Sequence, residues 1–178
     1  MFKKVGYVAL ASFTAHAIAL IRRGSAWEIL WMCTLASLWV GIGALLDNRT
    51  AVGIGVSWLI YGVPLWVVNV WRGGDLLPTS VLTHVAVLAV GVFYLARRGF
   101  AKGTYVKAWV CVLLLLLICR AISPPSFNLN LVYNLPVGET LVLNHSLYLT
   151  ALLLIGVLES FLLERAALRW LNGRRFSC

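Results

Sequence analysis

Four side chains of this sequence combine reactive groups with an apolar setting: His16, Cys33, His84 and His145. A histidine can act as a general base, and a cysteine beside it can become a nucleophile because the thiolate is then favoured. All four lie inside long apolar stretches. Ionisable groups in such stretches are costly to bury, so they are candidates for function. Whether these four side chains can act together depends on the helices that position them.

The composition is that of a membrane protein. Of the 178 residues, 61% are hydrophobic and 12% are charged, and the mean hydropathy is +0.90. A soluble domain is about 45–50% apolar and about 25% charged, so a soluble globular domain is excluded. Disorder is excluded too, because it needs low hydrophobicity and high charge.

Charge and cysteine patterns exclude further classes. The 15 Lys and Arg exceed the 6 Asp and Glu, but they form short clusters between apolar runs, a distribution typical of polytopic membrane proteins. We therefore expect no nucleic-acid partner. The four cysteines include no C-x-x-C pair, so they indicate neither a zinc site nor a disulfide scaffold.

Six apolar runs approach the length of about 20 residues that a helix needs to cross a bilayer. They span approximately residues 5–21, 27–46, 51–71, 79–95, 105–119 and 141–163. Turn-rich or charged segments separate them. The sequence therefore predicts an all-α fold, a single bundle of six transmembrane helices. Within it, Pro64 should kink the third helix, and four glycines should let the second and third helices pack closely. These are Gly41, Gly43, Gly53 and Gly55.

The positions of Lys and Arg predict the orientation. With a cytoplasmic N-terminus, the outer segments would hold only Arg22, Arg23, Arg72 and Arg120, and the inner segments all other basic residues. The positive-inside rule then places both termini in the cytoplasm of a multi-pass protein of the cell (plasma or inner) membrane. The tail, residues 164–178, alternates Arg with Leu and Trp and should lie along the inner interface.

This topology converts sequence position into depth. At 1.5 Å per residue, His16 and Cys33 lie about 9 Å from the outer ends of their helices, and His84 and His145 about 6–8 Å. We therefore expect these four side chains to share a polar cavity in the outer half of the membrane. Ser80 lies on the same helix face as His84, four residues away.

The long outer loop supplies a further candidate residue for this cavity. Residues 127–134 alternate polar and apolar side chains and include Asn130, which predicts either a flap over the cavity or an ordinary surface loop. The residues expected to bind a substrate are His16, Ser80, Asn130 and His145.

Cys33 and His84 are the candidate catalytic pair. A thiol near the ester region of a phospholipid can attack an acyl carbonyl and form a thioester. His84 would take the thiol proton and later that of an acceptor hydroxyl. Membrane lipids are thus the expected partners.

Short stretches of the chain resemble the YwaF-like family of six-helix membrane proteins, whose relatives include enzymes that transfer or hydrolyse fatty acyl groups in lipids. The matching positions are His16 and residues 30–33, 82–84, 130–136 and 146–148. They are spread over nearly the whole chain. The resemblance implies a six-helix fold and assigns acyl chemistry only to Cys33 and His84, while Trp31 departs from the polar residue that related sequences often have.

Two other classes of protein remain as alternatives: a haem or metal-binding protein, and a transporter or accessory subunit. Imidazoles and a thiol on different helices can ligate haem, copper or zinc; because no local chelating pair is present, we expect no cofactor and no bound metal. A small transporter, or an accessory or scaffold subunit of a membrane complex, would use the histidines as proton relays or packing groups. No internal repeat indicates a transporter fold.

Overall fold

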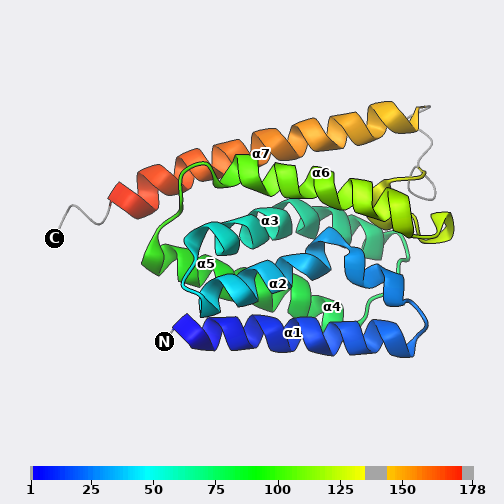
Figure 1. Cartoon of the computed structure of the whole chain (residues 1–178), viewed down its shortest axis with the longest axis horizontal. Coiled ribbons are helices and arrows are strands. Elements are labelled where there is room, and N and C mark those ends of the chain that lie inside the picture. Colours follow the sequence, from blue (N-terminus) through cyan, green and yellow to red (C-terminus); the bar gives the residue numbers. More distant parts are fainter. Residues whose placement is uncertain (1, 135–143, 174–178) are drawn as a thin grey trace.

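The computed structural model describes residues 2–134 and 144–173 (Figure 1). Helices and turns account for these ranges and no strand occurs in them, so the predicted all-α fold is confirmed. The main helices are α1 (Phe2–Arg22), α2 (Met32–Leu45), α3 (Arg49–Trp71), α4 (Pro78–Val81), α5 (Val87–Arg98), α6 (Thr104–Ile122) and α7 (His145–Gly173). A π turn, η2 (Leu82–Ala86), joins α4 to α5 in one rod.

The rods run up and down one bundle. Each is antiparallel to the one before it, so α1 begins and α7 ends at the same end of the bundle (Figure 1). The helix α3 lies at the centre, where it contacts α2, α5, α6 and α7. Five segments of the described chain are long and apolar enough to cross a membrane. They are Phe2–Arg22, Arg49–Trp71, Pro78–Arg98, Thr104–Ile122 and His145–Trp170.

The second predicted helix, residues 27–46, is broken near its start. A short 3-10 helix, η1 (Ala26–Leu30), ends at Trp31, whose backbone is extended, and α2 begins only at Met32. The α-helical part has 14 residues, fewer than a single spanning helix needs. The break is stabilised by Asn130, whose side-chain amide donates to the Leu30 carbonyl (3.0 Å) and whose amide oxygen accepts from the Met32 N–H (2.9 Å).

The last helix is shifted relative to its predicted bounds of 141–163. It begins at His145 because Asn144 caps it: the Asn144 side chain accepts from the backbone N–H of Ser146 (2.9 Å) and Leu147 (3.3 Å). Residues 141–143 lie outside the described ranges. The helix continues to Gly173, so the described start of the predicted tail is a direct extension of α7.

Glycines set the closest helix contacts. A Cβ on Gly55 would lie 2.6 Å from the carbonyl oxygen of Ala36, and a Cβ on Gly43 would lie 2.8 Å from the backbone nitrogen of Val52 at the start of α3. The predicted close contact between α2 and α3 is therefore confirmed for these two glycines. The prediction was wrong for the other two, because Gly41 faces α1 and Gly53 faces α6.

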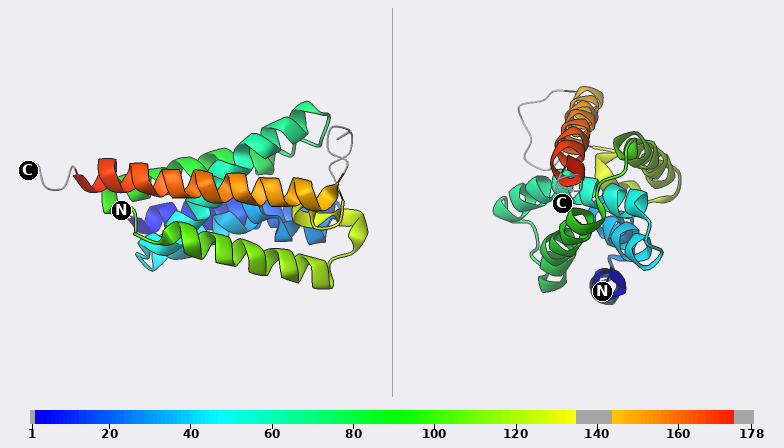
Figure 2. Two further views of the ribbon diagram at one scale, coloured as in Figure 1. Left: turned by 90° about the horizontal axis from the view of Figure 1, so that it is seen from above. Right: turned by 90° about the vertical axis from the view of Figure 1, so that its left-hand side faces the viewer.

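The centre of α3 and its end differ in packing. The helix is buried from Val52 to Leu59, whereas most residues after Pro64 are exposed. In Figure 2 this end of α3 leans away from α6 and α7. A proline inside a helix removes one backbone hydrogen bond and bends the axis, which agrees with the kink expected at Pro64.

We predict that Asn130→Ala destabilises the protein by about 1–3 kcal/mol for each of the two backbone groups it leaves unpaired. Thermal unfolding in detergent or nanodiscs measures this. Asn69→Ala, at an exposed asparagine near the end of α3, is the matched control. Equal melting temperatures for the two variants would contradict the role of Asn130 at the break.

Candidate functional site

His84 lies in the middle of the π turn η2 and is 6% exposed. Its Nδ1–H donates to the backbone carbonyl of Ser80 at 2.8 Å. Because a carbonyl can only accept, the proton of the neutral ring is on Nδ1, and Nε2 is the atom that can accept a proton. The ring stacks on Trp66 of α3, with centroids 4.5 Å apart and planes 10° from parallel. Single π turns within α-helices often occur at functional sites.

His16 of α1 lies beside this turn. Its Nδ1 is 3.0 Å from the hydroxyl oxygen of Thr79, and its imidazole is close enough to His84 for an electrostatic interaction. The Thr83 hydroxyl donates to the Thr79 carbonyl at 3.0 Å. We call His16, Thr79, Ser80, Thr83 and His84 the histidine cluster. It brings together three of the residues singled out in the sequence.

Ser80 acts in the histidine cluster through its backbone. Its hydroxyl donates to the Leu77 carbonyl at 2.7 Å, while its own carbonyl accepts from His84. Ser80 therefore orients the imidazole, although the sequence suggested that it binds a substrate.

Cys33 is the second residue of α2, and its sulfur packs against Gly62 of α3, where a Cβ would overlap it. Gly62 lies one turn before Trp66 on the same face of α3. Helical side chains lean toward the N-terminus, so the indole of Trp66 is directed back toward the Gly62 turn. The thiol and the imidazole of His84 thus lie along one face of α3. Among the residues that the structure describes, no hydrogen bond joins them.

Within the described residues, Asn130 and His145 form no hydrogen bond to the histidine cluster. Asn130 binds the break at Trp31 and lies 3.4 Å from the sulfur of Cys119. His145 donates from Nε2 to the Leu131 carbonyl at 2.7 Å. Because α7 begins at His145 rather than four residues earlier, the depth calculated for this residue from the sequence was wrong.

One polar residue that holds α6 against α7, Glu164, was not predicted from the sequence. The buried carboxylate of Glu164 accepts from the backbone N–H groups of Gly103 (2.8 Å) and Tyr105 (3.0 Å) at the start of α6. A negative charge there is favoured by the dipole of α6. The sequence contains one signal for this role. Glu164 is an acidic residue directly after an apolar run, a place where the positive-inside rule accounts only for Lys and Arg.

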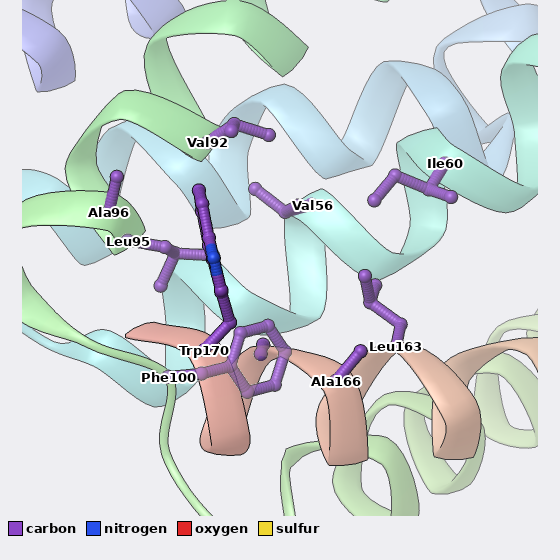
Figure 3. Close-up of a pocket in the computed structure, with 10 residues that line it drawn as sticks. Val56, Ile60, Val92, Leu95, Ala96, Phe100, Leu163, Ala166 and Trp170 are labelled. Atoms are coloured by element: carbon purple, nitrogen blue, oxygen red, sulfur yellow. The ribbon is translucent and has the colours of Figure 1, made fainter. Parts of the chain in front are cut away.

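Within the described ranges, no three His, Cys, Asp or Glu side chains are grouped so that they could hold a metal ion. A cavity of about 330 Å³ lies away from the histidine cluster, between α3, α5 and α7 (Figure 3). No pattern in the sequence indicates this cavity, because its lining comes from three helices with no shared motif.

Comparisons with known proteins add no identification. No protein-family model, curated protein or solved structure matches the chain. The resemblance to the YwaF-like family stays a prediction that depends on the short stretches quoted above.

The hydrogen bonds of His84 and His145 predict opposite tautomers. At pH 8, where an unperturbed imidazole is neutral, His84 should carry its proton on Nδ1 and His145 on Nε2. The 15N spectrum of histidine-labelled protein in lipid distinguishes the two forms, and His84→Gln and His145→Gln assign the signals. An Nε2–H signal for His84 would overturn the assignment of Nε2 as the proton acceptor.

Proposed function

We propose that this protein crosses a cell membrane six times, with both termini in the cytoplasm, and that it transfers acyl groups of membrane lipids. The surface supports the membrane part of the proposal. Large apolar side chains such as Leu117 (66% exposed) and Leu154 (65% exposed) cover the middle of the long helices. A soluble protein rarely exposes so large a continuous apolar surface.

Two ion pairs at helix ends support the placement of the helices across a membrane. Arg23 pairs with Asp75 next to the turn between α1 and η1, and Arg98 pairs with Asp47 next to the turn between α2 and α3. Both pairs thus lie at helix ends, outside the apolar stretches, where side chains can reach water and lipid headgroups.

The broken second segment is long enough to be the sixth pass. The 14 residues of α2 rise about 21 Å, and the five residues of η1 add about 10 Å. Together with the extended Trp31, their combined length exceeds the thickness of the hydrocarbon core, about 30 Å. The two hydrogen bonds from Asn130 supply the internal partners that the broken backbone needs where water is absent.

The acyl-transfer part depends on one observation, that Cys33 and His84 contact successive turns of the same face of α3. In the first step the thiol proton passes to Nε2 of His84 while the sulfur forms a bond to the ester carbonyl carbon. The ester C–O bond breaks, and the leaving alcohol takes the proton from His84. An acceptor hydroxyl then cleaves the thioester by the reverse sequence, with His84 again moving the proton.

The orientation predicts which side of the membrane each end faces. In a protein without other cysteines, Lys3→Cys should react with a membrane-impermeant maleimide only after cells are permeabilised, whereas Asp75→Cys should react in intact cells. Three passes separate these positions, so opposite sides are required. The reverse pattern would overturn the orientation, and labelling of both from one side would overturn the number of passes.

The catalytic pair predicts a non-additive loss of activity. With a phospholipid carrying a labelled acyl chain, His84→Gln should slow transfer by about 10²–10⁴-fold. Cys33→Ser and the double variant should be similarly inactive, because catalytic groups that act as a unit lose most activity together. Wild-type protein should hold a hydroxylamine-sensitive acyl label on Cys33.

Cys111→Ser is the matched control, since Cys111 is a half-buried cysteine on α6 and should leave transfer unchanged. An acyl label that persists in Cys33→Ser, or equal activity in all folded variants, would refute acyl transfer. A transport or accessory role would then be favoured.

A further inference from the structure

The cavity between α3, α5 and α7 is separate from the histidine cluster (Figure 3). Its volume of about 330 Å³ is at the lower end of the range typical of small-molecule sites. Apolar side chains line it, among them Val56, Ile60, Val92, Leu163, Ala166 and Trp170. Ile60 and Gly62 are two residues apart on α3 and point to opposite sides of the helix, so the cavity and Cys33 lie on different faces.

Glu159 lies at the midpoint of α7. The helix has 29 residues, so the carboxylate is about 21 Å along the axis from either end. Glu159, Leu163, Ala166 and Trp170 are spaced by four, three and four residues and form one stripe along α7. The last three line the cavity. Glu159 therefore lies one helical turn outside the cavity, next to the end of the cavity that Leu163 lines.

An electrostatic interaction with α3 supports this position. Glu159 is close enough to Tyr61 for an electrostatic interaction, and Tyr61 follows the cavity residue Ile60. The Tyr61 hydroxyl donates to the Leu152 carbonyl on α7 at 3.0 Å, so α3 and α7 are fixed against each other beside the cavity.

The carboxylate of Glu159 lacks a partner. It is half-buried, and within the described part of the chain it has no hydrogen bond or ion pair. Neither α3 after Arg49 nor the rod Pro78–Arg98 before Arg97 contains a Lys or Arg. The neighbouring helix α6 contains Lys107, which is exposed and forms no ion pair with Glu159 within the described residues. Glu164, one turn and a residue later, differs because two backbone N–H groups bind it.

We propose that this cavity binds a hydrophobic cation, an amine or quaternary ammonium with an alkyl chain, and that Glu159 pairs with its positive charge. The alkyl chain fills the apolar cavity. The cationic group lies at the midpoint of α7, where a carboxylate in hydrocarbon is costly without an opposite charge. The inference depends on the membrane placement proposed above and is independent of acyl transfer.

The test uses full-length protein in nanodiscs and radiolabelled dodecyltrimethylammonium as the probe, with uptake by empty nanodiscs subtracted. Wild-type protein should bind the probe saturably, and unlabelled dodecanol, which has the same chain but no charge, should compete at least ten-fold less well. Glu159→Gln should weaken binding of the cation at least ten-fold and should not lower the melting temperature, because it removes an unpaired charge from the bilayer.

Two further variants separate filling of the cavity from general damage to α7. Ala166→Phe should abolish binding because the ring occupies the cavity. Leu158→Phe, at an exposed position of α7 that does not line the cavity, should bind as wild type does. Cys33→Ser should also bind normally, so that failure of acyl transfer leaves this result unaffected.

Three outcomes would overturn the proposal. They are non-saturable uptake, equal competition by dodecanol, and cation binding in Glu159→Gln that equals that of wild type. Equal competition would identify the cavity as a groove for neutral lipid chains.

Discussion

In the contact between α2 and α3, a Cβ on Gly55 would lie 2.6 Å from the carbonyl oxygen of Ala36, so this position admits no larger side chain. Within a bilayer, helices gain little from the hydrophobic effect when they meet, and close van der Waals contact between small residues holds them together. The same approach brings the sulfur of Cys33 onto Gly62. The position of the thiol relative to the His84–Trp66 stack therefore depends on backbone contacts more than on any polar interaction.

A second constraint is that backbone groups need partners where water is absent. The helix ends and breaks of this chain meet it with side chains from distant segments. Asn130 binds the two ends of the break at Trp31, and Glu164 binds the start of α6. Asn48 and Asn144 cap α3 and α7 locally. Much of the polarity of the sequence therefore serves the backbone, which explains why Asn130 resembled a binding residue before its partners were known.

The positions of the helices could be predicted from the sequence because the length of an apolar run is a local property. The break at Trp31 could not be predicted, since its partner Asn130 lies about a hundred positions along the chain. Counting residues from a helix end predicts depth but not the face on which a side chain lies. Depth alone correctly predicts that His16 and His84 lie at one site. The predicted depth of His145 was wrong because α7 begins after its cap at Asn144, four residues later than the apolar run.

The polar groups that remain are those on which function can depend. Within the described residues, Nε2 of His84 and the carboxylate of Glu159 form no hydrogen bond to the backbone, whereas the side chains of Asn130, His145 and Glu164 do. Cys33 and His84 lie along one face of α3, and the cavity lies on its opposite face. As α3 is the central helix, it forms a wall common to both sites. A change in the tilt of its end beyond Pro64 would move Trp66, and with it the stacked ring of His84, while leaving the cavity wall at Val56 and Ile60 in place.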